Sequence, residues 1–536
     1  MLMVPSFGMA QSPGVAERGP DPGWLQYADP DESGFSFDGV DRVLEFGRRR
    51  GIAAGMVVHE GAVVLTWGDV ARRFPVHSIR KSFLSALYGM VPGRIDLERT
   101  LADLEIDDRS GLSDVERSAR VVDLISSRSG VYHPAAAEPA EMTEDRPVRG
   151  SAAPGERWWY NNWDFNAAGT AFERMTGEAV LDAIDARLAR PLGMEDYRRE
   201  HAFEARSEAS DHPSFHFRMS TRDLARFGLL FARDGRWREE QLIPKDWVQE
   251  STTAHSETDL GGSQPTAYGY MWWVDDAGGF SARGYGGHVV AVYPEDDLVV
   301  VLRADTFHDR FVSNRGVALL LDRIREARRG PASPTAALRP LEVDGADGVG
   351  RSAVPAIDIT RYVGDYGFGG EPGTVRVSAS GDSLFVDYGE GVFLLHPAGG
   401  HRFVTDDSRD PLEFERDANG AVARVLSEPI LYRAAASAAA RGDTAAAVAR
   451  VEEAVRVFPE SPRAHVNLAR AYLGTGRADE AAAQLDEALR LDPALDEAEQ
   501  LRRSLRGWSP RGWLVAAGAL LGMGWFVLRT RRRRGA

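Results

Sequence analysis

The sequence predicts an α+β protein of several domains. An antiparallel sheet flanked by helices and an all-helical part come first, and a small β domain, a helical repeat and a transmembrane helix follow. Three observations predict this order. Strand and helix patterns alternate over residues 31–330, a helical repeat occupies 435–508, and an uncharged apolar run occupies 512–528. The chain of 536 residues also exceeds a single domain, which usually takes about 100–200 residues.

The first and largest domain is expected at 31–330. Apolar alternation from 52 to 68 predicts a β-hairpin that turns near Glu60 and Gly61. An apolar face at 78–90 predicts a helix, and more helices are expected up to about residue 250. Apolar runs separated by Gly and Asp turns then predict an antiparallel sheet, which a last helix closes. These runs lie at 270–274, 288–293 and 298–302, and the last helix at 312–328.

Composition separates this domain from its neighbours. Residues 1–30 and 331–356 are rich in Pro and Gly, so we expect a flexible N-terminus and a linker there. The start, M-L-M-V-P-S-F-G-M-A-Q-S, resembles the end of a signal peptide but lacks the basic region. Short runs separated by turn residues predict a small β domain at 357–434.

An internal repeat rich in Ala and Leu occupies residues 435–508. Gly442 pairs with Gly476 and Pro459 with Pro493, and both offsets are 34 residues, the period of tetratricopeptide repeats. Unrelated Ala-rich helices would not produce a matching period. Such stacks present concave surfaces to peptides, so a protein partner is a candidate ligand of this region.

The C-terminus carries a candidate membrane anchor. The apolar run 512–528 reaches roughly 26 Å as a helix, near the lower limit for a span, and Trp513 and Trp525 suit its two interfaces. The arginine-rich tail 529–536 follows at once. The positive-inside rule places this tail in the cytoplasm and everything before the span outside, in a single-pass protein of the cell membrane. The alternative is a hydrophobic helix docked on the protein.

Charge and cysteine content exclude several classes of function. The net charge is −16 although the C-terminal tail is basic, and this acidity argues against nucleic acid as a partner. The chain contains no cysteine, which excludes disulfides, thiolate metal sites and a cysteine nucleophile. Neither a metal nor a cofactor is expected.

A lysine is conspicuous because lysine is so rare in this chain. Of 64 Lys and Arg residues only Lys81 and Lys245 are lysines, and Lys81 follows Arg80 directly. Arginine stays protonated in proteins, whereas a desolvated lysine can become a neutral base. Ser78 lies three residues earlier, on the same side of the helix, so a neutral amine can reach the hydroxyl and activate it. The alternative is an ordinary cation on a helix surface. We interpret Lys245 as structural.

Two further segments carry candidate site residues. Residues 155–169 contain Tyr160 and Asn162; a phenol near a cationic lysine loses its proton more easily and can act as a base or proton relay, and the amide can bind a substrate carbonyl. The alternative there is an aromatic core cluster with a capped helix start. Residues 280–294 form a glycine-rich strand edge that permits a ligand to approach the backbone, or an ordinary turn.

Together and in this order, the three motifs resemble the serine β-lactamase and penicillin-binding protein superfamily. They are most similar to its class C-related branch of esterases, D-aminopeptidases and 6-aminohexanoate-dimer hydrolases. S-I-R-K at 78–81 matches the Ser-x-x-Lys motif of the superfamily and Y-N-N at 160–162 its Tyr-x-Asn motif. A-R-G-Y-G-G at 282–287 occupies the place of its Lys/His-x-Gly motif, and the resemblance spans roughly 35–330.

The resemblance implies a role for each matching residue. The implied catalytic residues are Ser78 as acylated nucleophile, Lys81 as its base and Tyr160 as general base and then acid. The implied substrate-binding residues are Asn162, Gly284, Tyr285 and Gly286. The backbone N–H groups of Ser78 and Tyr285 would form the oxyanion hole. His133 and His288 are interpreted as local structure.

One motif departs from the superfamily pattern. The usual Lys or His, which holds the carboxylate of a β-lactam, is Ala282 here, and Arg283 should point to the opposite face of the strand. An ester, an amide or a short peptide is therefore favoured as substrate. The main hypothesis is a membrane-anchored serine acyl hydrolase. The alternative is a β-lactam-binding or inert hydrolase fold that serves as a membrane-tethered tetratricopeptide adaptor.

Overall fold

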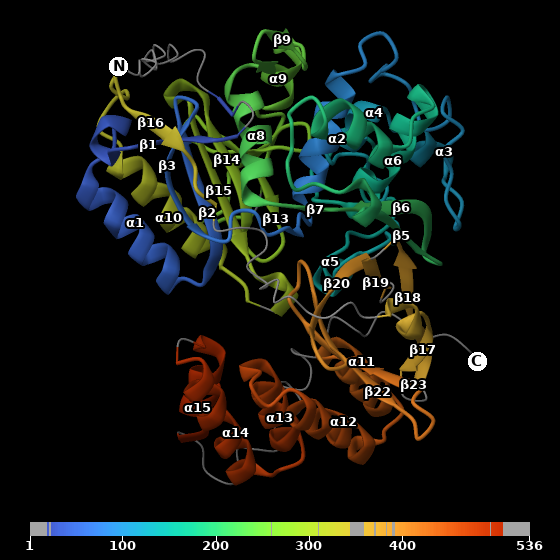
Figure 1. Cartoon of the computed structure of the whole chain (residues 1–536). Helices are drawn as coiled ribbons and strands as arrows, with labels where there is room; N and C mark the ends of the chain where they lie inside the picture. Colours follow the sequence, from blue (N-terminus) through green and yellow to red (C-terminus); the bar gives the residue numbers. More distant parts are fainter. Residues whose placement is uncertain are drawn as a thin grey trace, which may run out of the picture. The chain divides into compact units, whose positions relative to one another are not determined.

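The computed structural model describes most of the chain in two compact units. The described residues are 19–20, 23–258, 260–308, 310–343, 358–368, 371–381, 383–387, 392–493 and 495–506. The first unit covers Met1–Gly348 and the second Val349–Ala536. Each unit is described by itself (Figure 1).

A ten-stranded sheet forms the centre of the first unit. Its strands are β1 (Leu25–Tyr27), β2 (Ile52–His59), β3 (Ala62–Gly68), β10 (Ser256–Glu257), β11 (Ala267–Tyr268), β12 (Trp273–Val274), β13 (Phe280–Gly284), β14 (His288–Tyr293), β15 (Leu298–Ala304) and β16 (Leu338–Pro340). The spatial order is β10-β11-β12-β13-β14-β15-β2-β3-β1-β16. All neighbours are antiparallel except β1 and β3, which are parallel.

The hairpin between β2 and β3 turns where the sequence predicts it. Glu60 and Gly61 both have positive φ angles, 48° and 77°, as the two central residues of a tight hairpin turn require. His59 therefore pairs with Ala62, and the two strands keep their register up to a bulge at Val57 and Val58. The predicted antiparallel pairing of the runs at 288–293 and 298–302 is also present, as β14 and β15.

Both faces of the sheet are covered by helices, which explains why β14 and β15 are buried throughout. Helices α1 (Phe37–Arg49) and α10 (Asn314–Ala327) pack on one face, and α2 (Ile79–Gly89) and α8 (Thr221–Ala232) on the other (Figure 1). Alternate strand residues enter the two cores: Val290 and Val299 join the α8 side, and Val300 the α10 side. α8 approaches closely because Gly228 has no side chain; a Cβ there would lie 2.5 Å from Val299 Cγ1.

The part between α2 and α8 is less helical than the sequence predicts. Its helices are α3 (Asp114–Arg117), α4 (Val121–Ile125), α5 (Ala140–Glu144), α6 (Asn162–Thr176), α7 (Val180–Ala183) and a π-helix, η3 (Ile184–Ala189); α9 (Lys245–Ser251) follows α8. Short strands are interspersed: β4 (Phe74–Pro75) pairs with β7 (Arg218–Met219), β5 (Phe203–Ser207) with β6 (Ser210–His216), and β8 (Arg236–Trp237) with β9 (Glu240–Gln241).

Strand β6 was not predicted because several of its buried residues are polar. Ser210 Oγ donates to Asp108 Oδ2 over 3.0 Å, and His212 Nδ1 lies 3.0 Å from Thr170 Oγ1. Both side chains are buried, 4% exposed each. When the buried side chains of a strand are polar and hydrogen-bonded, the sequence shows no alternation of apolar and polar residues from which the strand could be predicted.

Three expectations about strands and loops are corrected. The run 270–274 is a strand only at its end, because Tyr270 and Met271 (φ 62°) form the turn that joins β11 to β12. Residues 1–30 are not entirely flexible, since β1 pairs with β3 and β16. The expected linker 331–356 contributes β16 to the sheet edge. The pairings of β1 and β16 join residues far apart in sequence. A strand of three residues is also too short to show a hydrophobic pattern.

The second unit contains a sheet and a stack of helices. The sheet is a meander of β17 (Gly364–Phe368), β18 (Glu371–Ser380), β19 (Ser383–Asp387), β20 (Val392–Gly399), β21 (Arg402–Thr405), β22 (Pro411–Arg416) and β23 (Val422–Leu426), paired in chain order. The helices are α11 (Glu428–Ala440), α12 (Thr444–Val457), α13 (Pro462–Gly474), α14 (Ala478–Leu491) and α15 (Asp496–Arg506).

The helices keep the predicted 34-residue period. α11, α13 and α15 begin at residues 428, 462 and 496, and α12 and α14 at 444 and 478. Gly442 and Gly476, with φ angles of 82° and 77°, occupy the same left-handed position between the paired helices. The stack starts earlier than residue 435, because Ser427 caps α11 as Ser461 caps α13.

The predicted membrane span at 512–528 and the basic tail at 529–536 lie outside the described residues. Among the described helices, none combines the length and the apolar composition needed to cross a membrane.

Candidate active site

Ser78 stands at the start of α2, where a sharp turn leads from β4 into the helix. The turn is made by His77, whose φ of 47° is unusual for a residue with a side chain. Ser78 is the N-cap residue of α2, and every residue from Ile79 to Gly89 is buried. The Ser78 side chain makes no capping hydrogen bond, and the first N–H groups of the helix, those of Ile79, Arg80 and Lys81, donate to backbone carbonyls.

Lys81 connects the predicted catalytic residues. Its Nζ lies 2.7 Å from Ser78 Oγ, 2.8 Å from Tyr160 Oη and 2.8 Å from Asn162 Oδ1. The side chain is 1% exposed, so it is not the surface cation of the alternative interpretation. The structure thus brings together four of the residues that the sequence singles out, although about 80 positions separate Lys81 from Tyr160 and Asn162.

The ionisation of these groups follows from burial. Burial, with the nearby Arg80, holds the pKa of Lys81 well below its ordinary value, which favours the neutral amine. Burial raises the pKa of Tyr160 to about 12 and outweighs the hydrogen bond to Ser78 and the charge of Arg80. Burial thus favours the protonated phenol, contrary to the expectation that Tyr160 loses its proton easily.

Tyr160 and Asn162 are positioned by the start of α6. Asn161, between them, is the N-cap residue; its Oδ1 accepts from the Trp163 N–H over 3.1 Å and its Nδ2 donates to the Val131 carbonyl over 2.8 Å. The ring of Tyr160 stacks on Trp273 at 5.2 Å between centroids. The two asparagines therefore have different tasks, since Asn161 caps the helix and Asn162 binds Lys81.

The glycine-rich turn between β13 and β14 lies against the segment that carries Ser78. A Cβ at Gly284 would lie 2.7 Å from the Val76 carbonyl oxygen and 3.3 Å from His77 Cβ. Gly286 has a φ of 82°, and a Cβ there would lie 2.4 Å from Thr306 Cγ2. Tyr285, between them, is 54% exposed. Glycine is required because the two backbones touch, and the role of Tyr285 in an oxyanion hole stays a prediction.

Arg283 does not replace the Lys or His of the superfamily motif that is Ala282 in this chain. Ala282 is fully buried and belongs to the core on the α8 side of the sheet. Arg283 pairs with Val289, whose side chain belongs to the opposite core, and its Nε donates to Ser281 Oγ over 2.9 Å. The guanidinium thus points away from Ser78, as strand alternation predicts.

A chain of hydrogen bonds below the turn includes residues that the sequence analysis missed. His77 Nε2 lies 2.9 Å and His288 Nε2 3.2 Å from Thr306 Oγ1, and Arg303 Nε donates to His288 Nδ1 over 2.9 Å. Only the position of His77 directly before Ser78 could have drawn attention to it, because neither a positive φ nor a distant Thr306 is readable from sequence. His288 is therefore part of the local structure.

His133 and Lys245 lie elsewhere. His133 Nε2 is 3.2 Å from Glu116 Oε1, and its Nδ1 is 3.0 Å from Ser110 Oγ. Lys245 is exposed and forms an ion pair of 3.0 Å with Asp234. Both positions agree with the structural roles expected for them.

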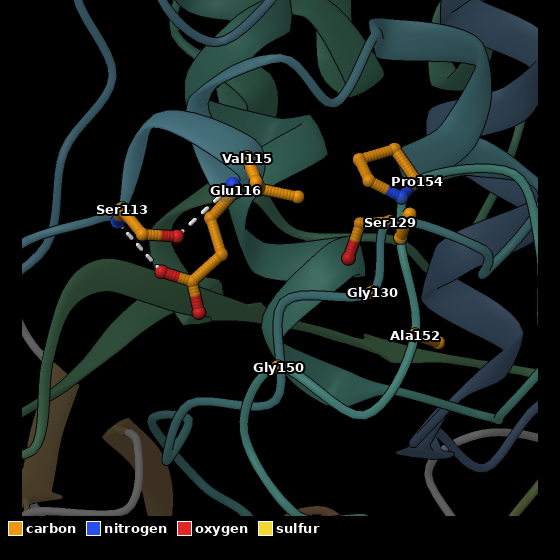
Figure 2. A pocket seen from close by; sticks show the side chains of 9 residues that line it. Ser113, Val115, Glu116, Ser129, Gly130, Gly150, Ala152 and Pro154 are labelled. Carbon is orange, nitrogen blue, oxygen red and sulfur yellow. Dashed lines mark hydrogen bonds between the residues drawn. The ribbon is translucent and has the colours of Figure 1, made fainter.

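A cavity of about 220 Å³ lies between α3 and the loops at 129–130 and 150–154. Figure 2 shows Ser113 and Glu116 on its wall, joined by the two hydrogen bonds of a capping box. Its lining contains none of the residues predicted for the active site, so we assign it no part in the chemistry of Ser78.

Comparison with known proteins identifies the family. A β-lactamase family model matches residues 40–323, more than half of the chain, and the protein belongs to the β-lactamase family. A tetratricopeptide-repeat model matches residues 438–505. Both assignments made from the sequence motifs are confirmed.

Three solved structures are similar. A candidate 6-aminohexanoate-dimer hydrolase from Bacillus anthracis is 19% identical with a TM-score of 0.42 and covers 53% of this chain and 81% of that one. A penicillin-binding protein from Bacillus halodurans is 15% identical with a TM-score of 0.41, covering 53% and 99%. A penicillin-binding protein homologue from Caulobacter crescentus is 15% identical with a TM-score of 0.42, covering 56% and 99%.

A curated relative covers less of the chain. An uncharacterized protein of Alkalihalophilus pseudofirmus is 25% identical over 114 residues, which are 19% of this chain and 34% of that protein. The match thus spans about a third of the relative's length.

Proposed function

We propose that the protein is a serine acyl hydrolase that forms an acyl-enzyme on Ser78. The observation that carries this proposal is the contact of 2.7 Å between the Ser78 hydroxyl and the buried Lys81 amine, whose pKa is held well below its ordinary value. A serine becomes a nucleophile when a positioned base takes its proton, and a neutral amine is such a base. Membership of the β-lactamase family supports the same chemistry.

The acylation step follows from the hydrogen bonds. Ser78 Oγ attacks the substrate carbonyl carbon while its proton passes to Lys81 Nζ. The oxyanion that develops is met by the N–H of Ser78 and, as proposed, by that of Tyr285. The Tyr160 phenol then protonates the leaving group and recovers a proton from Lys81 across their contact of 2.8 Å. Water or another acceptor resolves the acyl-enzyme by the reverse transfers.

Asn162 is the proposed ligand of the substrate amide or ester. Its Oδ1 is occupied by Lys81, and its Nδ2 makes no hydrogen bond within the described part of the chain. That amino group is free to donate to a substrate carbonyl. Because the cation that holds a β-lactam carboxylate in the superfamily is Ala282 here, we propose an ester, an amide or a short peptide as the substrate.

The proposed location is the cell membrane, with the catalytic unit outside the cytoplasm. The apolar run 512–528 and the basic residues 529–536 support this proposal through the positive-inside rule. A reporter fused after Ala536 tests it. Cytoplasmic activity of the reporter is the expected result, and activity outside the cytoplasm would reverse the topology.

A second candidate function is that of an adaptor, which the tetratricopeptide match at 438–505 favours. In that case helices α11–α15 recruit a protein and the hydrolase site is silent. Cross-linking of the full chain in its native membrane tests this function. Cross-links from α11–α15 to one partner support it, and their absence counts against it.

The first experiment is intact-mass spectrometry of the full chain after treatment with a fluorophosphonate probe. A single adduct is expected on the wild type and none on Ser78→Ala. Ser82→Ala is the matched control, because Ser82 lies one turn further along α2 and donates to the Met271 carbonyl over 2.8 Å. An adduct that survives in Ser78→Ala, or none on folded wild type, contradicts the proposal.

A further inference from the structure

Arg80 is a buried cation without a counter-ion in the described part of the chain. Its side chain is 4% exposed, and its guanidinium carbon lies 4.6 Å from the ring centroid of Phe215. Nη2 donates to Asn166 Oδ1 over 3.1 Å, and Nη1 makes no hydrogen bond among the described residues. No described carboxylate forms an ion pair with it.

An unpaired buried charge is costly, and two other buried arginines have more partners than Arg80. Arg226, which is 1% exposed, forms an ion pair of 2.6 Å with Glu195 and also donates to the Leu192 carbonyl. Arg303, fully buried, donates to His288 and to three backbone carbonyls. Arg80 has one neutral amide oxygen instead. We infer that Arg80, whose buried charge lowers the folding stability, is retained for a reason other than stability.

The surroundings of Arg80 connect it to Lys81. Asn162 and Asn166 are four residues apart on α6 and so share one face of that helix. Asn162 Oδ1 binds Lys81 Nζ, and Asn166 Oδ1 binds Arg80. The orientation of Asn166 is set by its Nδ2, which donates to the Ala136 carbonyl over 3.2 Å. Two adjacent cationic residue types on α2 thus meet two neutral amides, where carboxylates would neutralise them.

We propose that Arg80 is a positioning residue whose unpaired guanidinium keeps the Lys81 amine in the neutral form that can take the Ser78 proton. This inference rests on the proposed function. A like charge nearby disfavours protonation of an amine, and a buried site screens that repulsion weakly. The neutral Asn166 contributes to this effect, because a carboxylate at position 166 would neutralise the charge of Arg80 and so its repulsion of a protonated Lys81.

The other titratable groups around Lys81 do not supply this field. His77 precedes α2, His216 lies on β6, Tyr160 precedes α6, Asp164 lies on α6 and Tyr268 on β11. Burial lowers the pKa of His77 to about 4 and of His216 to about 3, so both are neutral at pH 7. Burial raises the pKa values of Tyr160, Asp164 and Tyr268, which favours their protonated, neutral forms. Among these groups Arg80 is the charged one.

The rarity of lysine permits a direct test. Biosynthetic labelling of the full chain with [ε-¹³C]lysine gives two NMR signals, because Lys81 and Lys245 are the only lysines. Exposed Lys245 serves as the internal reference. In the wild type, Lys81 is expected to titrate below the ordinary range of a lysine. In Arg80→Met its midpoint is expected to rise by roughly 1–2 pH units, the size of a nearby charge effect, while Lys245 is unchanged.

A second variant keeps Arg80 and removes its effect. Asn166→Asp places a carboxylate against the guanidinium, so the Lys81 midpoint should rise as in Arg80→Met. Arg226→Met is the control, because it deletes a buried arginine of α8 that is paired with Glu195. Its Lys81 midpoint should equal that of the wild type.

The rate of acylation by the fluorophosphonate provides the functional readout. The acidic side of its pH–rate profile should shift to higher pH together with the Lys81 midpoint. Acylation of Arg80→Met should therefore be about tenfold slower than that of the wild type at neutral pH and reach the wild-type rate at alkaline pH. Unmoved Lys81 midpoints in both variants overturn the role of Arg80, even where acylation is slower. Failure of wild-type Ser78 to react, with a shifted midpoint in the variants, instead overturns the proposed function.

Discussion

Replacing Lys81 with arginine is the sharpest perturbation of the proposed mechanism. Lys81 Nζ is within 2.8 Å of Ser78, Tyr160 and Asn162. An arginine at this position still carries N–H donors for these partners. Arginine cannot be deprotonated in a protein and therefore cannot take the Ser78 proton. We expect Lys81→Arg to lose acylation although it carries a basic side chain.

The size of the loss follows from the role of the base. General-base catalysis contributes about 10²–10⁴-fold, so acylation should fall by about 10³-fold, equivalent to about 4 kcal/mol. A second buried guanidinium beside Arg80 also destabilises the fold, which complicates the comparison. Lys81→Met separates the two effects, because it removes the amine without adding charge. It leaves Asn162 Oδ1 without its donor, at a cost of about 1–3 kcal/mol in folding stability.

The assay is the rate of fluorophosphonate adduct formation, followed by intact mass on protein shown to be folded by circular dichroism. Lys245→Arg is the matched control, since Lys245 is exposed and its ion pair with Asp234 tolerates arginine. The control should react like the wild type, and Lys81→Arg and Lys81→Met should both be slow. Acylation of Lys81→Arg at the wild-type rate would refute the assignment of Lys81 as base.

Three further predictions concern other parts of the site. Tyr160→Phe keeps the ring but removes the leaving-group proton, so hydrolysis of an amide should fall by about 10²-fold and that of an activated ester by less; equal losses would contradict this role. Gly284→Ala places a Cβ 2.7 Å from the Val76 carbonyl, so urea unfolding should reveal a loss of about 1–3 kcal/mol together with slower acylation; a wild-type midpoint would disprove the close approach. Burial raises the pKa of Asp305, but the hydrogen bonds and positive charges of His308 and Arg72 together outweigh it and bring the pKa down to about 2. Since this folded value is below the unfolded one of about 3.9, the stabilisation is complete above pH ~4 and is lost as the pH falls toward 2. Asp305→Asn should lose that acid dependence in thermal unfolding, and an unaltered slope would contradict it.

Features that depend on neighbours in sequence were predictable. The spacing of Ser78 and Lys81 places them on one side of a helix, and their contact of 2.7 Å is the outcome. The turn at Glu60 and Gly61 follows from local backbone preference. The helical repeat follows from its period, because each unit packs on the next in the same way.

Features that depend on distant partners were not predictable. The strands β1 and β16 pair across more than 300 residues, and each is too short to carry a pattern. The strand β6 is buried through Ser210 and His212, whose partners Asp108 and Thr170 come from other elements. Hydrophobic periodicity detects apolar burial and is blind to polar burial of this kind.

The sequence by itself determined the order of the motifs and which residues are predicted to carry the chemistry. It singled out Ser78, Lys81, Tyr160 and Asn162, because each residue type has the acid–base or hydrogen-bonding capacity that acyl transfer needs. The tertiary structure decided their ionisation. Whether Lys81 is neutral and Tyr160 protonated depends on burial and on Arg80, and the free energy of desolvation exists only once distant segments enclose a group.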